Sequence, residues 1–259
     1  MDSLDRIRAS LVAVLACAMI CAAMATNLQA GPIAQPAGLA AARHSTEPFG
    51  LGAWDLLAGT LNDKWQALAR KLDDERVQIA LCDGDRERCA SPAALRFLAI
   101  VDQGRGREGR ARIGEINRAV NLALRPASDL AQYGEEDVWS SPLATFSRGA
   151  GDCEDYAIAK YVALRQAGLA ARDLRVVILH DALHHEDHAV AAARLEGQWL
   201  LLDNQRMAMI EDTDARNVRP LFVIDENGIA KYDDGPLLVS APEPLPTIAA
   251  AQASVATAE

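Results

Sequence analysis

Apolar side chains recur at helical spacing in three stretches of the first half of the chain. These stretches cover residues 57–72, 91–102 and 113–124, and each gathers its apolar side chains on one face. A serine and a proline open the second stretch, a pair typical of a helix cap and the first helical residue. Pro126 ends the third stretch, because proline disfavours helical backbone in the residue before it. The pattern predicts three amphipathic helices, followed by an irregular segment over residues 127–148.

A fourth helical pattern starts in the sequence Gly-Ala-Gly-Asp-Cys-Glu-Asp-Tyr-Ala at residues 149–157. Apolar residues repeat at helical spacing from Ala157 to Leu164, and Gly168 supplies a C-terminal stop. Cys153 therefore falls in the first turn of the predicted helix.

The second half of the chain has the pattern of a sheet. Residues 174–179 form a short run of β-branched and leucine side chains, typical of a buried strand. Residues 188–195 and 198–204 form two more apolar runs, and Glu196-Gly197 separates them, so we expect an antiparallel hairpin. Helices followed by these strands predict an α+β fold, in which the helix that starts at the cysteine packs on an antiparallel sheet.

The length of the hairpin turn decides which side chains of its two strands meet. A turn of two residues pairs Val190 with Asp203 and makes His188 and Asp203 diagonal neighbours on one face. Such diagonals lie about 7–8 Å apart at Cα, within reach of a hydrogen bond between a carboxylate and an imidazole. A turn of three residues would break this arrangement. With the shorter turn, Cys153, His188 and Asp203 supply a nucleophile, a base and an orienting acid.

Cys153 has surroundings that act on its thiol in opposite directions. The free N–H groups and the positive end of a helix favour a thiolate there. A small buried core cysteine is the alternative, which the acidic neighbours Asp152, Glu154 and Asp155 disfavour. Each of these carboxylates would disfavour the thiolate by about 1–2.4 kcal/mol at about 7 Å. A hard divalent cation held by their oxygens would cancel that repulsion.

A histidine-rich stretch from His180 to His188 has the composition of a zinc site but not the spacing. A metallopeptidase helix needs glutamate directly after the first of two histidines four residues apart. Here His185 follows His184, and the acid arrives at Glu186. We therefore expect most of these histidines to lie in a loop and His188 to enter a strand.

Composition bounds the size of the core and the kind of partner. The chain has 259 residues, of which 50% are hydrophobic, enough for one substantial core. Its formal net charge is −10, which argues against nucleic acid as a partner and is compatible with cation binding.

Both ends of the chain are expected to lie outside the folded domain. Arg6 and Arg8 precede a short apolar run that small residues close, so residues 1–30 have the form of a signal peptide for export. An uncleaved N-terminal anchor is the alternative. Residues 31–48, rich in Ala, Gly and Pro, predict a flexible lead-in, and residues 241–259 predict a disordered tail.

Three cysteines remain after the predicted signal peptide. Cys82 and Cys89 flank a short polar loop, which suits a local disulfide in an oxidising compartment. Metal binding by this pair is disfavoured, because no second Cys or His pair has a matching spacing. Cys153 is then the unpaired thiol of an exported protein, which marks it as a candidate reactive group.

Three motifs together resemble a known family. Gly-Asp-Cys-Glu-Asp-Tyr-Ala at 151–157, His-Ala-Val at 188–190 and Leu-Asp-Asn at 202–204 resemble signatures of the bacterial transglutaminase-like cysteine peptidases, the LapG-type proteases. The resemblance runs over about residues 54–227. It implies a papain- and transglutaminase-like fold for a domain that we place at residues 49–240.

The same resemblance implies a role for each residue of the motifs. Cys153 would be the nucleophile, His188 the general base and acid, and Asp203 the residue that orients His188. Asn117 and Asn121, one turn apart on a predicted helix, also fit the family. We expect them to form structural hydrogen bonds and assign them no chemistry.

The resemblance further implies a metal, a substrate and a partner. Ca²⁺ is expected as cofactor, with Asp152, Glu154 and Asp155 as candidate ligands. Family members of this type are periplasmic and cut a large repeat adhesin of the cell surface near its N-terminus, after a pair of alanines. An inner-membrane cyclic-di-GMP receptor sequesters them and thereby preserves biofilm attachment. The chain is thus expected to be a calcium-dependent periplasmic cysteine endopeptidase.

Two other functions stay open from the sequence. A thioester on Cys153 reacts with an amine as well as with water, so transglutaminase-type acyl transfer is one alternative. A calcium-dependent binding module with an inactive site is the other. The intact cysteine, histidine and aspartate argue against the inactive module.

Overall fold

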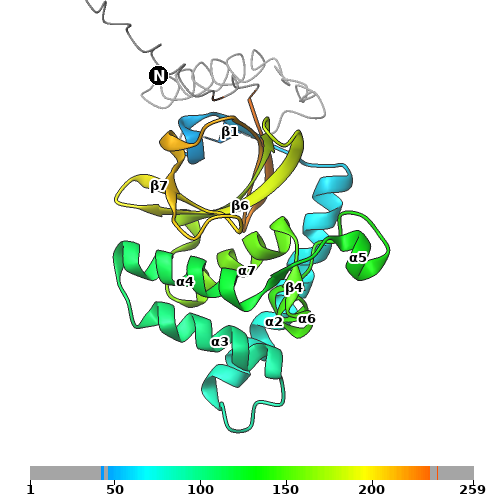
Figure 1. The fold of residues 1–259 in the computed structure, drawn as a ribbon, viewed down its shortest axis with the longest axis vertical. Coiled ribbons are helices and arrows are strands. Elements are labelled where there is room, and N and C mark those ends of the chain that lie inside the picture. The colour runs from blue at the N-terminus through cyan, green and yellow to red at the C-terminus, as the bar shows by residue number, and fades with distance from the viewer. Residues whose placement is uncertain (1–41, 44–45, 234–237, 239–259) are drawn as a thin grey trace, which may run out of the picture. The chain divides into compact units, whose positions relative to one another are not determined.

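The helices lie, along the chain, between the first two strands and the later strands of a curled antiparallel sheet (Figure 1). The computed structural model describes residues 42–43, 46–233 and 238. The predicted signal peptide and C-terminal tail lie outside these residues. Among the helices that are described, none has the length and apolar character needed to cross a membrane.

The four predicted helices are present in the predicted order, with different lengths, and two short helices lie between the third and the fourth. Together they are α2 (Thr60–Gly84), α3 (Pro92–Arg105), α4 (Gly109–Ala123), α5 (Asp129–Tyr133), α6 (Pro142–Arg148) and α7 (Cys153–Gln166). Ser91 caps α3 as predicted, because its hydroxyl accepts a hydrogen bond from the Ala94 N–H at 3.2 Å. Leu57 was expected in the first helix, but it precedes α2 and is 69% exposed. The helix instead continues beyond residue 72 to Gly84, and the buried side chains of Ile79 and Cys82 anchor its last turns.

Residues 127–148 were expected to be irregular, but part of this segment is helical. They contain the short helices α5 and α6, which are too brief for a hydrophobic period to show. Tertiary contacts hold α6 in place: the carboxylate of Glu75 accepts hydrogen bonds from the Ser141 hydroxyl at 2.5 Å and the Leu143 N–H at 2.9 Å. A short parallel pair, β3 (Arg125–Pro126) with β4 (Ala150–Gly151), connects the ends of this segment.

The main sheet is antiparallel, with strand order β1-β2-β10-β9-β5-β6-β7-β8. In chain order its strands are β1 (Ala42–Arg43), β2 (Ala53–Asp55), β5 (Leu174–Asp181), β6 (Glu186–Leu195), β7 (Gln198–Leu202), β8 (Ile210–Glu211), β9 (Val218–Asp225) and β10 (Gly228–Tyr232). Figure 1 shows the sheet curling round on itself, with α4 and α7 along its outer face. The 3-10 helices η1 (Pro48–Gly50) and η3 (Asp212–Asp214) meet near its two ends, where the Phe49 N–H donates to the Asp212 carboxylate at 2.5 Å.

Two hydrophobic cores lie on the two faces of this sheet, and β6 contributes to both. Ala189, Ala191 and Ala193 pack in the core on the side of the helices. Val190 and Ala192 pack in a second core on the opposite face. Because successive strand residues point to opposite faces, a strand buried on both sides needs an unbroken apolar run. The small alanines on one face leave room for α7 to approach the sheet closely.

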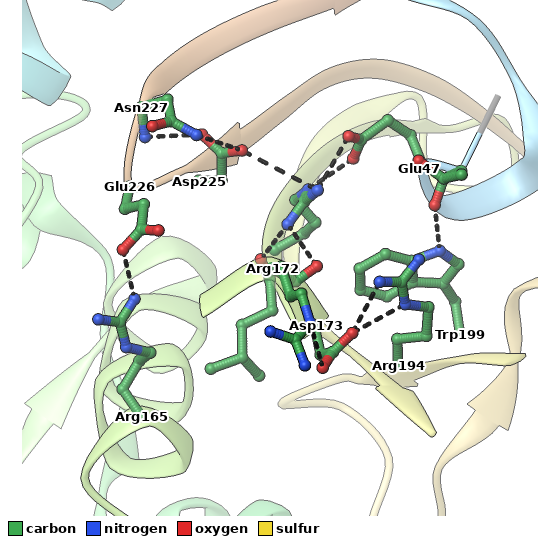
Figure 2. A network of polar contacts seen from close by, with 12 residues as sticks. Glu47, Arg165, Arg172, Asp173, Arg194, Trp199, Asp225, Glu226 and Asn227 are labelled. Atoms are coloured by element: carbon green, nitrogen blue, oxygen red, sulfur yellow. Dashed lines mark hydrogen bonds and ion pairs between the residues drawn. The ribbon is translucent and has the colours of Figure 1, made fainter. Parts of the chain in front are cut away.

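The segment just before η1 is tied to the sheet, although the sequence analysis placed it in the flexible lead-in. Glu47 is buried, and its carboxylate binds the Arg175 guanidinium through contacts of 2.5 and 2.9 Å. Asp225 lies 3.9 Å from the same guanidinium (Figure 2). The indole N–H of Trp199 donates to the Thr46 carbonyl at 2.9 Å. Residue 48 is therefore too late a boundary for the folded domain, because residues 46–48 already contact it.

A disulfide joins Cys82 and Cys89 at the end of α2, as predicted, with 4.8 Å between their Cα atoms. It closes the loop that leads to α3. Cys153 is the free cysteine of the described residues, so it is the thiol available for chemistry.

Candidate active site

The hairpin of β6 and β7 has the predicted two-residue turn. Glu196 and Gly197 both have positive φ, 52° and 88°, as a tight hairpin turn of this twist requires. Leu195 consequently pairs with Gln198, and the register continues from that pair along both strands. The predicted register is confirmed up to the pair of Ala191 with Leu202, the residue directly before Asp203.

His188 and Asp203 form a hydrogen-bonded pair at the end of this hairpin. The distance between His188 Nε2 and Asp203 Oδ1 is 2.9 Å, and His188 is buried. Asp203 follows the last residue of β7, and its Oδ1 also accepts the Gln205 N–H at 2.9 Å. Burial tends to raise the pKa of Asp203, but the hydrogen bonds from His188 and Gln205 outweigh it, so the pKa is lowered. The carboxylate is therefore ionised at neutral pH and able to orient the imidazole.

Cys153 is the first residue of α7, and Asp152 is the N-cap. The thiol donates a hydrogen bond to Glu154, with 3.1 Å between Sγ and Oε2. Burial raises the pKa of the thiol, the Glu154 and Asp152 charges raise it further, and a hydrogen bond from the Ala189 N–H acts in the opposite direction. The raised pKa agrees with the expectation that the neighbouring carboxylates disfavour the thiolate, and burial adds to their effect.

One cleft of about 540 Å³ is lined by both Cys153 and His188. Trp139, Ile178 and Phe222 give it an apolar wall. The Trp139 ring is buried and fixed in place, because it packs edge-on against another tryptophan of the core. A thiol and an imidazole that open on a shared cavity can act on one bound substrate.

Three carboxylates gather at one side of the cleft. Asp129, Asp152 and Glu154 each offer an oxygen, and these oxygens lie within 4.8 Å of one another. The pKa of Asp152 is raised to about 9. Burial is the largest cause, and repulsion from the charges of Glu154 and Asp155 adds to it.

The donor set suits a hard cation. All three groups offer oxygen, the ligand that Ca²⁺ prefers. Within the described part of the chain, Asp129 Oδ1 and Asp152 Oδ1 are buried and accept no hydrogen bond. Buried carboxylate oxygens without a partner are costly, and a cation would supply the missing contact.

Asp155 lies apart from this group, although the sequence analysis named it with Asp152 and Glu154. Its side chain is fully buried, and its Oδ1 accepts the Ser140 N–H at 2.9 Å. Burial raises the pKa of Asp155 to about 7, against the lowering effect of the Ser140 hydrogen bond. The structure thus groups Asp129, rather than Asp155, with the two other carboxylates.

The sequence profile of the bacterial transglutaminase-like cysteine proteinases matches residues 78–218, which include Cys153, His188 and Asp203. The chain belongs to this family. Its chemistry is therefore that of a cysteine proteinase, as the motifs indicated. No curated protein matches the chain.

Solved structures confirm the fold of this cysteine proteinase. LapG from Legionella pneumophila has a TM-score of 0.50 and 21% sequence identity over 61% of this chain and 86% of LapG. EGTA-treated LapG from the same organism gives a TM-score of 0.50 and 19% identity over 62% of this chain and 89% of LapG. Calcium-bound LapG gives 0.49 and 21% identity over 58% of this chain and 84% of LapG. The first two likenesses confirm the predicted α+β fold, with helices packed on an antiparallel sheet.

The histidine-rich stretch of the proteinase spans the end of β5, a turn and the start of β6. His184 and His185 lie in the turn, as expected, whereas His180 lies in β5. His184 Nδ1 lies 2.8 Å from Asp181 Oδ2, and His180 Nδ1 lies 2.9 Å from Asp187 Oδ1. No histidine belongs to a metal-binding group among the residues that the structure describes. Of the histidines in this stretch, His188 lines the cleft together with Cys153.

Sequence reasoning missed Asp129 because the residue lies far from the cysteine motif in the chain. It is the first residue of α5, inside the segment that was expected to be irregular. One signal was available: Ser128 before Asp129 is a helix cap, and its hydroxyl accepts the Ala131 N–H at 3.4 Å. The fold brings Asp129 close to Asp152, and no local sequence pattern predicts this contact.

Proposed function

We propose that this proteinase is a calcium-dependent periplasmic endopeptidase that cleaves a large cell-surface adhesin near its N-terminus and thereby controls biofilm attachment. The observation that carries the proposal is the pair of His188 and Asp203, 2.9 Å apart, with the imidazole on the same cleft as Cys153. Nucleophile, base and orienting acid are the parts that acyl-transfer chemistry requires.

The residues divide the chemistry as follows. Because His188 Nε2 faces Asp203, Nδ1 is the nitrogen left to take the proton from the Cys153 thiol. The thiolate sulfur attacks the carbonyl carbon of the scissile peptide bond, and the tetrahedral intermediate expels the amine, which receives the proton from His188. Water then attacks the thioester, with His188 as base, and releases the acid and the free thiol. Asp203 stabilises the imidazolium in both halves.

Asp129, Asp152 and Glu154 would hold the calcium ion. When bound, the ion supplies positive charge that offsets the carboxylates raising the pKa of Cys153. Asp152 is also the N-cap of α7, so the group of carboxylates is joined directly to the helix that presents the nucleophile. LapG, the similar protein named above, has a calcium-bound form.

The test uses the full chain without its signal peptide and, as substrate, a recombinant N-terminal fragment of a large repeat adhesin that contains an Ala-Ala pair. Wild type with Ca²⁺ should cut the fragment into two products with new termini, which mass spectrometry identifies. Cys153→Ala should leave the fragment intact while keeping the circular dichroism spectrum of the wild type. Full cleavage by Cys153→Ala would overturn the assignment.

The same experiment separates the alternative functions. With a primary amine present, hydrolysis gives new termini alone, whereas acyl transfer gives a product heavier by the amine. A protein that binds the fragment in Ca²⁺ but never cuts it would be a binding module. The intact pair of His188 and Asp203 supports catalysis over that outcome.

Localisation and the regulatory partner rest on family resemblance. We propose that the proteinase acts in the periplasm and that an inner-membrane cyclic-di-GMP receptor withholds it from the adhesin. Cleavage of the adhesin fragment should fall when the periplasmic domain of such a receptor, loaded with cyclic-di-GMP, is added. Unchanged cleavage, together with no binding in a pull-down, would count against this partner.

A further inference from the structure

The loop that carries Asp203 is held by side chains through its main-chain carbonyl oxygens. The Asn121 side-chain amide donates to the Asp203 carbonyl at 2.9 Å and to the Arg206 carbonyl at 3.1 Å. The Asn117 amide donates to the Arg206 carbonyl at 3.3 Å and to the Met207 carbonyl at 3.0 Å. Both asparagines are buried on α4, so one helix binds this loop at both ends.

A third donor reaches the same loop from α7. Lys160 is fully buried, and its ammonium nitrogen lies 3.3 Å from the carbonyl oxygen of Leu202, the residue before Asp203. Lys160 is about two turns after Cys153, which places both residues on the same side of α7. One helix therefore presents the nucleophile and contacts the strand end that carries the acid.

A lysine at this position is not explained by packing. An ammonium group taken out of water is destabilising unless it is paired, and the Lys160 contact is a neutral carbonyl. The charge of Asp203 favours the protonated lysine, and the ring centre of Tyr156 lies 5.9 Å from the nitrogen. Conversely, the Lys160 charge favours the ionised form of Asp203.

We propose that Lys160, together with Asn121 and Asn117, positions Asp203 so that its carboxylate holds the His188 imidazole in the catalytic orientation. This inference rests on the proposed function, because it assigns supporting residues to the proposed acid. The three side chains are positioning residues: they bind the main chain around Asp203 and do not touch the reacting atoms. Hydrogen bonds from rigid helices restrict the loop, and a restricted carboxylate orients the imidazole better than a mobile one.

The test compares Lys160→Met with Leu164→Ala. Methionine keeps the length and apolar character of the lysine side chain but has neither the charge nor the donor. Leu164 is also fully buried in α7 and belongs to the core on the side of the helices, so its truncation controls for a loss of packing alone. We expect Lys160→Met to lower kcat about 10- to 100-fold while KM stays within about twofold of the wild type. Leu164→Ala should lower the unfolding temperature without this selective loss of kcat.

A measurement without substrate makes the test independent of proteolysis. The imidazole proton shared by His188 and Asp203 should give a strongly downfield proton NMR signal. Cys153→Ala should keep this signal, Asp203→Asn should lose it, and Lys160→Met should shift or broaden it. If Cys153→Ala still cleaves the adhesin fragment, the proposed function fails, while the NMR signal still decides whether Lys160 positions Asp203.

The outcomes are decisive in both directions. Lys160→Met with the kcat and NMR signal of the wild type would overturn the inference, as would an equal kcat loss in Leu164→Ala. Should Lys160→Met not fold, Asn121→Leu is the second variant, because it removes two hydrogen bonds to the same loop. It must lower kcat with an unchanged KM and shift the same signal, or the proposal is wrong.

Discussion

The carboxylate of Glu154 accepts a hydrogen bond from the thiol of Cys153, with 3.1 Å between Oε2 and Sγ. The two residues are neighbours in the first turn of α7, so the group that has to lose its proton lies against a negative charge. Burial and that charge together raise the pKa of the thiol. We therefore expect the proteinase to need a positive charge that offsets its own carboxylates.

Removal of calcium should abolish cleavage. EGTA should stop the reaction, and Ca²⁺ should restore it better than Mg²⁺, because the smaller ion demands a stricter octahedral geometry. Asp152→Ala and Glu154→Ala should mimic the chelator, and Asp129→Ala should do the same because its oxygen lies with theirs. Calorimetric titration with Ca²⁺ measures the loss of binding separately from activity.

The matched control for these variants is Glu136→Gln. Glu136 is an exposed carboxylate that lines the cleft but lies outside the group of three. The calcium affinity and cleavage rate of the Glu136→Gln variant should stay close to those of the wild type. Undiminished activity of the EGTA-treated wild type would contradict the calcium requirement and leave the assignment of Cys153 untouched.

Asp203→Asn should keep the fold and lose most of the activity. The amide oxygen can still accept the Gln205 N–H that Asp203 binds, but an amide does not stabilise the imidazolium and favours the wrong tautomer of His188. We expect kcat to fall by about 10³- to 10⁴-fold, with a thermal unfolding temperature near that of the wild type. Near-normal turnover in steady-state kinetics would show that Asp203 is a bystander.

The Cys82–Cys89 disulfide should be present in exported protein and absent from protein made in a reducing cytoplasm. Peptide mapping without reductant should find the two cysteines linked and Cys153 alkylated. In the loop-entropy model, so short a loop stabilises the fold by roughly 2–3 kcal/mol at most, so the Cys82→Ser, Cys89→Ser double variant should unfold at lower urea concentration. Complete alkylation of either cysteine in exported protein would rule the bond out.

Lys160 should make stability depend on pH in a way that Lys160→Met does not. Burial lowers the pKa of Lys160 from 10.5 to about 7, although the charge of Asp203 acts in the opposite direction. Between these values the unfolded chain binds a proton that the folded chain does not, so this residue makes stability rise with pH. Below about pH 7 both states are protonated, and the penalty of burying the charge is fully present.

The measurement is urea unfolding of both proteins between about pH 6 and pH 9. The free energy of unfolding of Lys160→Met, taken relative to the wild type, should fall as the pH rises, because the wild type sheds its buried charge. Other titrating groups are common to both proteins and cancel in this difference. A difference independent of pH would mean that folding leaves the pKa of Lys160 at its ordinary value.

The start of α7 and the hairpin register followed from the sequence alone because both depend on neighbouring residues. A glycine pair before an apolar helical repeat placed Cys153 in the first turn. The turn at Glu196 and Gly197 has a length that local residues specify, and strand alternation then brings His188 to the face of Asp203. The positions of the proposed nucleophile, base and acid were thus predictable from short-range rules.

Only the tertiary structure decided which residues support that site. Asp129 joins the other carboxylates from a short helix remote in sequence. Asp155 lies outside this group, and its carboxylate accepts the Ser140 N–H instead. Lys160 and Asn121 are polar residues at buried helix positions, where periodicity predicts core and says nothing of a partner. These contacts depend on how α4, α5 and α7 pack against the sheet, and packing between distant segments leaves no periodic trace in the chain.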